Sequence, residues 1–212
     1  MQIKPRPTNT SIVKAVAIFI CLLFVTQVHA LTATEVFQKG KNKLTLAKTV
    51  TASFSMKADG NIFTGKLLSK GNKFTITSNA SSYWYNGSDL YTYIPKKSET
   101  TVFKPSSSEL LEINPLLYLN SSTSYNITTT KTKKAGLETI VLLPKTSRSS
   151  VKSVTIDLDS KTFLPKYIKI VTSSGGIIDL SILNIQLNSN ISDSSFTYPK
   201  SSYPKAKIID MR

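Results

Sequence analysis

The chain has 212 residues, with 27 lysines and arginines against 12 aspartates and glutamates, and its formal net charge is +15 at pH 7. This length suits one domain. A single cysteine, Cys21, and a single histidine, His29, exclude an internal disulfide and leave few of the usual zinc ligands.

The N-terminal segment predicts a signal peptide. An apolar run at 15–25 follows three basic residues, and it is too short for a comfortable membrane span. Val28 and Ala30 place small or medium side chains at the two positions that a signal peptidase reads. We therefore expect a signal peptide at 1–30, cleavage after Ala30, export to the periplasm and a single mature domain at 31–212. A retained membrane anchor is the alternative.

Removal of this segment restricts the chemistry of the mature chain, because Cys21 and His29 leave with it. Without a thiol or an imidazole, Ser-His-Asp and Cys-His catalysis are excluded. We expect no enzyme, no catalytic residue, no metal and no cofactor. The 24 basic and 12 acidic residues that remain give a net charge of +12, which favours anionic membrane surfaces. Export argues against a nucleic-acid partner.

The first half of the mature chain predicts one helix and then strands. Residues 32–46 have helical spacing of apolar side chains, with Gly40 as a weak point. Alternation of apolar and polar residues at 50–56 indicates a half-buried strand. Further strands are expected at 62–69, at 74–76, on both arms of the Asn86-Gly87 turn and at 100–104, with turns at Asp59-Gly60 and 70–72.

The pattern changes to helix at 105–120. Ser106 and Glu109 have the spacing of a capping box, which satisfies two amide donors at a helix start. Pro115 disfavours helix at Asn114, so we expect two short helices with a break between them. This apolar segment either plugs one end of a sheet core or forms a lid over a cavity.

The second half predicts more strands joined by short turns. These strands lie at 125–131, 137–143, 151–158, 163–171 and 177–187, and a tail follows at 196–212. About ten consecutive strands form an antiparallel meander, which twists and curls into a barrel or half-barrel. Two helical segments are too few to cover its concave face fully. Apolar residues there would line a groove that suits an acyl chain.

Two groups of side chains have a chemical and a structural interpretation. Asp157 and Asp159 lie two residues apart, as paired acid–base carboxylates on one strand face do, but the second also begins an ordinary turn. Trp84, with Tyr83 and Tyr85, has the ring surface to stack on sugars or bases. The simpler interpretation of the three aromatic rings is that they pack against one another within a hairpin. The simpler interpretation of the two carboxylates is that they help to form a turn.

Several segments carry a family resemblance by their order and spacing. They are 32–46, 50–56, Gly65-Lys-Leu-Leu-Ser-Lys-Gly-Asn-Lys-Phe74, Tyr85-Asn-Gly-Ser-Asp-Leu-Tyr-Thr-Tyr-Ile-Pro95, Asn114-Pro115-Leu-Leu117, Phe196-Thr-Tyr-Pro199 and Ile208-Ile-Asp-Met-Arg212. This layout, behind a signal peptide, resembles the LolA family of periplasmic outer-membrane lipoprotein carriers. The resemblance implies a mainly β protein with helices (α+β), an unclosed, strongly curved antiparallel β-barrel with an α-helical lid.

The resemblance also implies a function and partners. In that family the cavity takes the acyl groups of a lipidated lipoprotein, which comes from an inner-membrane ABC exporter and passes to an outer-membrane acceptor. We expect the same partners here and a monomer. A typical member has Lys-Arg-Pro where this chain has Ser69-Lys70-Gly71. In the family, the arginine helps to hold the lid shut. We expect Lys70 to be the lid latch here, with the same positive charge but without the planar guanidinium that binds a carboxylate through two hydrogen bonds.

The sequence therefore favours a carrier of lipoproteins that acts by binding. The alternative is a signalling or structural module on the same scaffold that senses envelope lipids or proteins. Strand register decides which alternating set of side chains faces the cavity. The residues that we expect to line it are Phe54, Met56, Phe74, Ile76, Trp84, Tyr91, Leu110, Leu111, Leu116 and Leu117.

Overall fold

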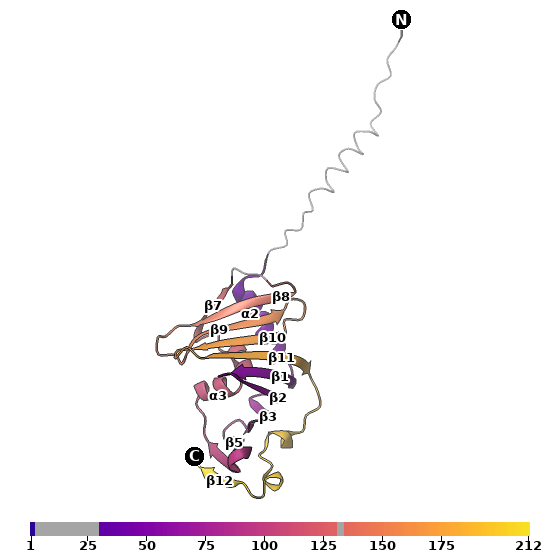
Figure 1. Cartoon of the computed structure of the whole chain (residues 1–212). Coiled ribbons are helices and arrows are strands. Elements are labelled where there is room, and N and C mark those ends of the chain that lie inside the picture. Colours follow the sequence, from indigo (N-terminus) through magenta and orange to yellow (C-terminus); the bar gives the residue numbers. More distant parts are fainter. Residues whose placement is uncertain (3–29, 131–133) are drawn as a thin grey trace. The chain divides into compact units, whose positions relative to one another are not determined.

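The computed structural model describes residues 1, 2, 30–130 and 134–212 (Figure 1). The predicted signal peptide falls almost wholly on 3–29, outside the described residues. The chain divides into two units, Met1–Leu31 and Thr32–Arg212. All helices and strands of the described residues belong to the second unit.

The described residues of the second unit form one twelve-stranded sheet whose order is β12-β6-β5-β4-β3-β2-β1-β11-β10-β9-β8-β7. The N-terminal strands are β1 (Val50–Ala58), β2 (Asn61–Lys70), β3 (Lys73–Ser78), β4 (Ser82–Tyr85), β5 (Leu90–Ile94) and β6 (Glu99–Phe103). The later strands are β7 (Tyr125–Thr129), β8 (Leu137–Pro144), β9 (Val151–Asp159), β10 (Pro165–Thr172), β11 (Ile177–Leu187) and β12 (Lys207–Asp210). The sheet is curved and unclosed, because β12 and β7 form two separate edges. The predicted fold class is thereby confirmed.

The order of the strands corrects the prediction of one uninterrupted meander. Strands β1–β6 and β7–β11 are two meanders, and they meet where β1 pairs with β11, antiparallel from Val50 opposite Leu187 to Ala58 opposite Ile178. The tail predicted at 196–212 contains β12, which pairs with β6 in parallel. Local sequence patterns do not reveal either pairing, because both join residues more than a hundred positions apart.

The first helix, α2 (Ala33–Thr45), begins with a capping box formed by Thr32 and Glu35. It packs against β7, β8 and the 3₁₀ helix η2 (Pro115–Asn120). Gly40 lies on its buried face, where a Cβ atom would approach the Leu158 side chain to 2.7 Å. The glycine that weakens the helix pattern thus permits close packing of the helix on the sheet.

The segment between β6 and β7 consists of α3 (Ser107–Ile113) and the 3₁₀ helix η2 (Pro115–Asn120). The predicted capping box of Ser106 and Glu109 is present, and the two helices are separated at Asn114, as predicted. None of the α3 residues is buried, whereas four of the six η2 residues are. The segment, hereafter the lid segment (107–120), therefore joins an exposed cover, α3, to a buried plug, η2.

The C-terminal segment covers one face of β3–β6. The 3₁₀ helix η3 (Asp193–Phe196) packs against β3, and the Thr75 hydroxyl donates to the Ser195 carbonyl at 2.6 Å. The Thr100 hydroxyl donates to the hydroxyl of Tyr198 at 2.9 Å. A second 3₁₀ helix, η4 (Lys200–Ser202), leads to β12. This face is thus closed by the chain itself, and the opposite face is left for the lid segment.

Candidate ligand-binding cavity

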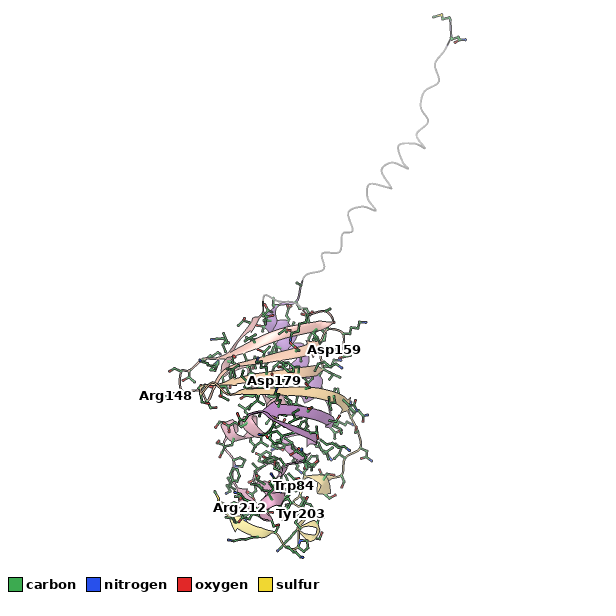
Figure 2. The ribbon with its side chains drawn as sticks, viewed as in Figure 1. Trp84, Arg148, Asp159, Asp179, Tyr203 and Arg212 are labelled. Atoms are coloured by element: carbon green, nitrogen blue, oxygen red, sulfur yellow. The ribbon has the colours of Figure 1, made fainter. Side chains whose placement is uncertain are left out.

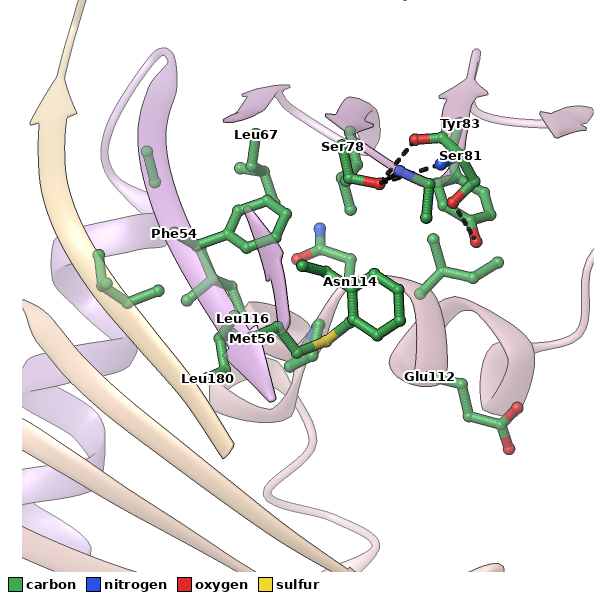
Figure 3. A pocket seen from close by; sticks show the side chains of 17 residues that line it. Phe54, Met56, Leu67, Ser78, Ser81, Tyr83, Glu112, Asn114, Leu116 and Leu180 are labelled. Carbon is green, nitrogen blue, oxygen red and sulfur yellow. Dashed lines mark hydrogen bonds between the residues drawn. The ribbon is translucent and has the colours of Figure 1, made fainter. Parts of the chain in front are cut away.

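A cavity of about 360 Å³ lies between the sheet and the lid segment (Figure 3). This volume falls within the range of small-molecule sites, roughly 300–1,000 Å³. Most of the lining is apolar, and it comes from β1–β4, the β3–β4 turn, β11 and the lid segment. The lining residues are Ala52, Phe54, Met56, Phe63, Leu67, Ile76, Ser78, Ala80, Ser81, Tyr83, Glu112, Ile113, Asn114, Pro115, Leu116, Leu180 and Ile182.

The period of two in a strand explains the floor of the cavity. Alternate β1 residues, Ala52, Phe54 and Met56, project from one face. Their partners across the ladders lie on the same face: Leu67 is opposite Ala52, and Ile182 is opposite Phe54. Because these neighbours come from both meanders, the cavity lies at the junction of the two halves of the sheet.

The lid segment forms the other wall. Leu116 is 7% exposed and contributes its side chain from η2, whereas Glu112 is exposed at the end of α3. The plug is anchored beside the cavity by Tyr118, whose ring meets that of Tyr125 edge-on at 5.8 Å between centroids. Burial raises the pKa of the Tyr118 hydroxyl above its ordinary value. This hydroxyl therefore stays neutral in the physiological range.

Polar groups gather at the β3–β4 turn. The Ser78 hydroxyl oxygen accepts from the backbone amides of Ala80 and Ser81 at 3.2 and 3.1 Å, and the Ser81 hydroxyl donates to the Tyr83 hydroxyl at 3.0 Å (Figure 3). These groups satisfy one another. They make a short polar border and leave the rest of the wall apolar.

A second cavity of about 250 Å³ adjoins the first. Leu67, Asn114 and Leu116 line both, so they form the partition between them. Its lining is more mixed, since polar side chains stand beside aliphatic ones. The lining residues are Leu44, Thr45, Ala47, Val50, Leu67, Ser69, Gly71, Asn114, Leu116, Leu117 and Asn120.

Four of the residues expected to line the cavity lie in its wall: Phe54, Met56, Ile76 and Leu116. Leu117 lines only the second cavity. The first cavity is also lined by residues that were not expected from the sequence, among them Phe63, Leu67, Leu180 and Ile182. The Asp59-Gly60 turn predicted that β2 lies beside β1, but local patterns did not reveal that β11 pairs with the other edge of β1.

The other five expected residues lie outside both of these cavities. Phe74 is buried on the same face of β3 as Ile76 and packs against Tyr85, with 5.3 Å between the ring centroids. Leu110 and Leu111 are half-buried on α3 and do not belong to the lining. Because α3 is a short helix with an exposed surface, only its C-terminal end reaches the cavity.

Trp84 and Tyr91 project from the opposite face of the sheet. Trp84 pairs with Thr75, not with Ile76, so it shares the face that the C-terminal segment covers. Its ring packs edge-on against Tyr198 and Tyr203 at 5.4 and 5.7 Å, and Figure 2 shows Trp84 beside Tyr203. The Tyr91 ring stacks on Tyr198. These contacts are those of an aromatic core beneath the tail, which agrees with the packing interpretation of Trp84.

Lys70 pairs with the C-terminal segment. Its ammonium lies 3.2 Å from Oδ1 of Asp193, and that of Lys73 lies 3.7 Å from the same atom. The pKa of the Asp193 carboxyl lies below its usual value, mainly because of Lys70 and to a smaller extent because of Lys73. The ion-pair partner of the expected latch residue thus belongs to η3 and not to the lid segment.

The two carboxylates considered for acid–base chemistry have separate structural partners. Asp157 is 2% exposed and accepts from Lys134 at 2.6 Å and from Thr139 at 2.7 Å. Asp159 accepts from the amides of Lys161 and Thr162 at 3.1 and 2.8 Å, which lowers the pKa of its carboxyl. Neither carboxylate lines the two cavities described above.

Residues 1–2, 30–130 and 134–212 lack the features of two other kinds of site. Within them, histidine, cysteine, aspartate and glutamate do not gather in groups of three or more that would hold a metal ion. Across the same ranges, no helix has the length and apolar character to cross a membrane.

Comparison with known proteins agrees with this architecture. No curated protein matches the chain. An uncharacterized conserved protein from Thermus thermophilus has a TM-score of 0.57 at 9% identity, over 84% of this chain and 98% of that one. At such identity the likeness shows a common fold and nothing more.

Two further structures are more distant in shape. A LolA superfamily protein from Nitrosomonas europaea is 14% identical over 80% of this chain and 99% of its own, with a TM-score of 0.45. A putative outer membrane lipoprotein-sorting protein domain from Vibrio parahaemolyticus is 12% identical over 82% of this chain and 98% of its own, with a TM-score of 0.47.

The family model described as outer membrane lipoprotein carrier protein LolA matches residues 24–174, well over half of the 212 residues. The chain therefore belongs to the LolA family.

Proposed function

We propose that this protein is a periplasmic carrier that binds the acyl chains of lipoproteins in the cavity beneath the lid segment. The observation that carries the proposal is the cavity itself, an apolar space of about 360 Å³ between the sheet and the lid segment. Each methylene buried in such a space contributes about 0.8 kcal/mol. Membership of a family described by lipoprotein carriage supports the same cargo.

The arrangement of the lid segment suits reversible loading. The plug η2 keeps Leu116 against the floor, while α3 has no buried residue to hold it in place. Elements with few buried contacts open at low free-energy cost. An acyl chain can then enter beside α3 while the buried end of the segment keeps the sheet intact.

The proposed path of the cargo is the one that the resemblance to the LolA family implies. In this proposal a signal peptide at 1–30 directs the mature domain, 31–212, to the periplasm. The carrier receives a lipidated lipoprotein from an inner-membrane ABC exporter and passes it to an outer-membrane acceptor, as a monomer and without a cofactor. The net charge of +12 of the mature chain favours approach to anionic membrane surfaces at both ends of this path.

Native mass spectrometry of the mature chain mixed with one lipoprotein, in lipidated and unlipidated forms, tests the proposal. We expect a complex with the lipidated form only, because the cavity recognises acyl chains and not the folded cargo. Equal binding of both forms would contradict the proposal and favour a sensing module that recognises protein surfaces. Absence of both complexes would contradict acyl-chain carriage.

A further inference from the structure

Asn114 contains an unpaired polar atom in the wall of the cavity. The residue is 2% exposed, and its side-chain Oδ1 has no hydrogen-bond partner. Its backbone is fully used, since the amide donates to the Leu110 carbonyl at 2.9 Å and the carbonyl accepts from the Leu117 amide at 3.0 Å. A buried acceptor without a donor is costly and rare in folded proteins. A ligand of this cavity would therefore be expected to supply the hydrogen-bond donor that Oδ1 lacks.

The position of Asn114 is fixed by the break in the lid segment. It is the last residue before Pro115, with φ −123° and ψ 87°, between α3 and η2. The residue before a proline is held away from helical geometry, and both adjacent helices anchor its backbone. Its carboxamide points into the cavity beside Phe54 and Leu116 (Figure 3). The side chain thus presents an acceptor from a rigid wall.

Asn114 also stands where the lining changes in character. The first cavity is bounded mainly by aliphatic and aromatic side chains, whereas the second contains Thr45, Ser69 and Asn120. Because Asn114 lines both, it lies at the boundary between a space for an acyl chain and a space for a polar group. The link between a lipid chain and its head group would occupy that boundary.

We propose that Asn114 is a specificity-determining residue that accepts a hydrogen bond from the amide N–H of an N-acylated lipoprotein terminus. This inference rests on the proposed function. An amide link supplies the donor that Oδ1 lacks, while an ester link contains acceptors only. The carrier therefore distinguishes an amide-linked chain from an ester-linked chain of the same length.

A matched pair of probes tests the selection directly. N-methylhexadecanamide and methyl hexadecanoate share the chain and differ in the N–H group. We expect the amide to bind the mature protein about tenfold more tightly, the worth of one buried hydrogen bond. In Asn114→Leu, a replacement of similar size without a polar atom, the two probes should bind alike, because the acceptor that distinguishes them is gone.

The control is Asn184→Leu, which makes the same chemical change at an exposed position of β11 that lines neither cavity. It should retain the preference for the amide. Circular dichroism and urea unfolding establish that both variants are folded. Equal binding of the two probes by the wild type, or an unchanged preference in Asn114→Leu, would overturn the inference and leave the carrier function standing. Failure of both probes to bind the wild type would overturn the carrier function as well.

A second comparison identifies the source of the amide. A tetrapeptide with an N-terminal palmitoyl group and N-palmitoylglycine both contain the amide-linked chain, but only the first continues as a polypeptide. We expect the lipopeptide to bind more tightly, because the second cavity has room for the residues that follow the amide. Equal or tighter binding of N-palmitoylglycine would overturn the assignment of the amide to a lipoprotein.

Discussion

Gly65 of β2 lies directly opposite Phe54 of β1, and a Cβ atom at Gly65 would come within 2.6 Å of Cζ of the Phe54 ring. The same atom would lie 2.3 Å from the carbonyl oxygen of Thr77 on β3. The ring thus occupies the space that a side chain at Gly65 would fill. The floor of the cavity has its shape because Gly65 has no side chain that would displace the Phe54 ring.

Gly65→Ala should lower the free energy of unfolding by about 1–3 kcal/mol, the usual cost of overpacking. The displaced Phe54 ring should also weaken the binding of N-methylhexadecanamide, because the ring moves into the cavity. Urea unfolding and titration with the amide measure the two effects. Thr64→Ala, at the exposed neighbouring position of β2, is the control and should change neither. Unaltered stability in Gly65→Ala would show that the strands separate easily here.

Leu116→Glu should abolish binding of the same probe. The side chain is 7% exposed and lines both cavities, and an unpaired charge in an apolar site costs several kcal/mol. Leu183→Glu makes the same change on β11, where the side chain is 65% exposed, and it should bind as the wild type does. Titration calorimetry on both variants is the measurement. A folded Leu116→Glu protein with normal affinity would place the acyl site elsewhere.

The two capping boxes have nearly equal geometry but should differ in their effect on stability. The amide of the third helical residue donates to the cap hydroxyl at 3.3 Å in both, from Glu35 to Thr32 and from Glu109 to Ser106. Loss of such a cap costs about 1 kcal/mol. Thr32→Ala should lower the global free energy of unfolding by that amount, because Val36, Phe37 and Gly40 of α2 are buried in the core.

Ser106→Ala should instead act locally, because α3 has no buried residue. We expect faster hydrogen exchange at the α3 amides and little change in the unfolding midpoint. The two variants, measured by hydrogen exchange and urea unfolding together, form a matched pair. An equal loss of global stability in both would show that α3 is an integral part of the core.

Acidification should loosen β12 from the sheet. The Arg212 side chain and backbone amide donate to the Asp210 carboxylate at 2.6–3.1 Å, and the pKa of that carboxyl falls from 3.8 to about 2. A lowered pKa in the folded state means that the stabilisation is full above pH 3.8 and is lost as the pH falls toward 2. NMR titration of the Asp210 carboxyl and exchange of the β12 amides should report this window. In Arg212→Gln the pKa of the Asp210 carboxyl should rise toward its ordinary value. An unchanged pKa in this variant would contradict the pairing of Asp210 with Arg212.

The local features of the fold were predictable because they depend on neighbouring residues. The Asp59-Gly60 turn has positive φ at both residues, 48° and 76°, as such hairpin turns require. Ser106 with Glu109 and the break at Pro115 follow equally from short-range chemistry. Each of these signals is complete within four or five positions of the chain.

The remaining features depend on which strands meet. Alternation places Trp84 and Tyr85 on opposite faces of β4, but it does not say which face the C-terminal segment covers. A shift of one position exchanges the two faces, so the prediction placed Trp84 and Tyr91 on the cavity side. Leu180 and Ile182 join the wall only because β11 pairs with β1. Asn114 was seen as a helix boundary, and only its burial reveals the unpaired oxygen.

The route of the lid segment has a further consequence, because it is the only chain connection between the two meanders. A cut within α3 would give two complementary pieces, one with β1–β6 and the other with β7–β12. They would reassociate along the β1–β11 ladder and through the parallel β12–β6 pair. Since Phe54 comes from one piece and Ile182 from the other, neither contains a finished cavity. The cavity thus spans the seam between the two pieces and would be complete only after they join.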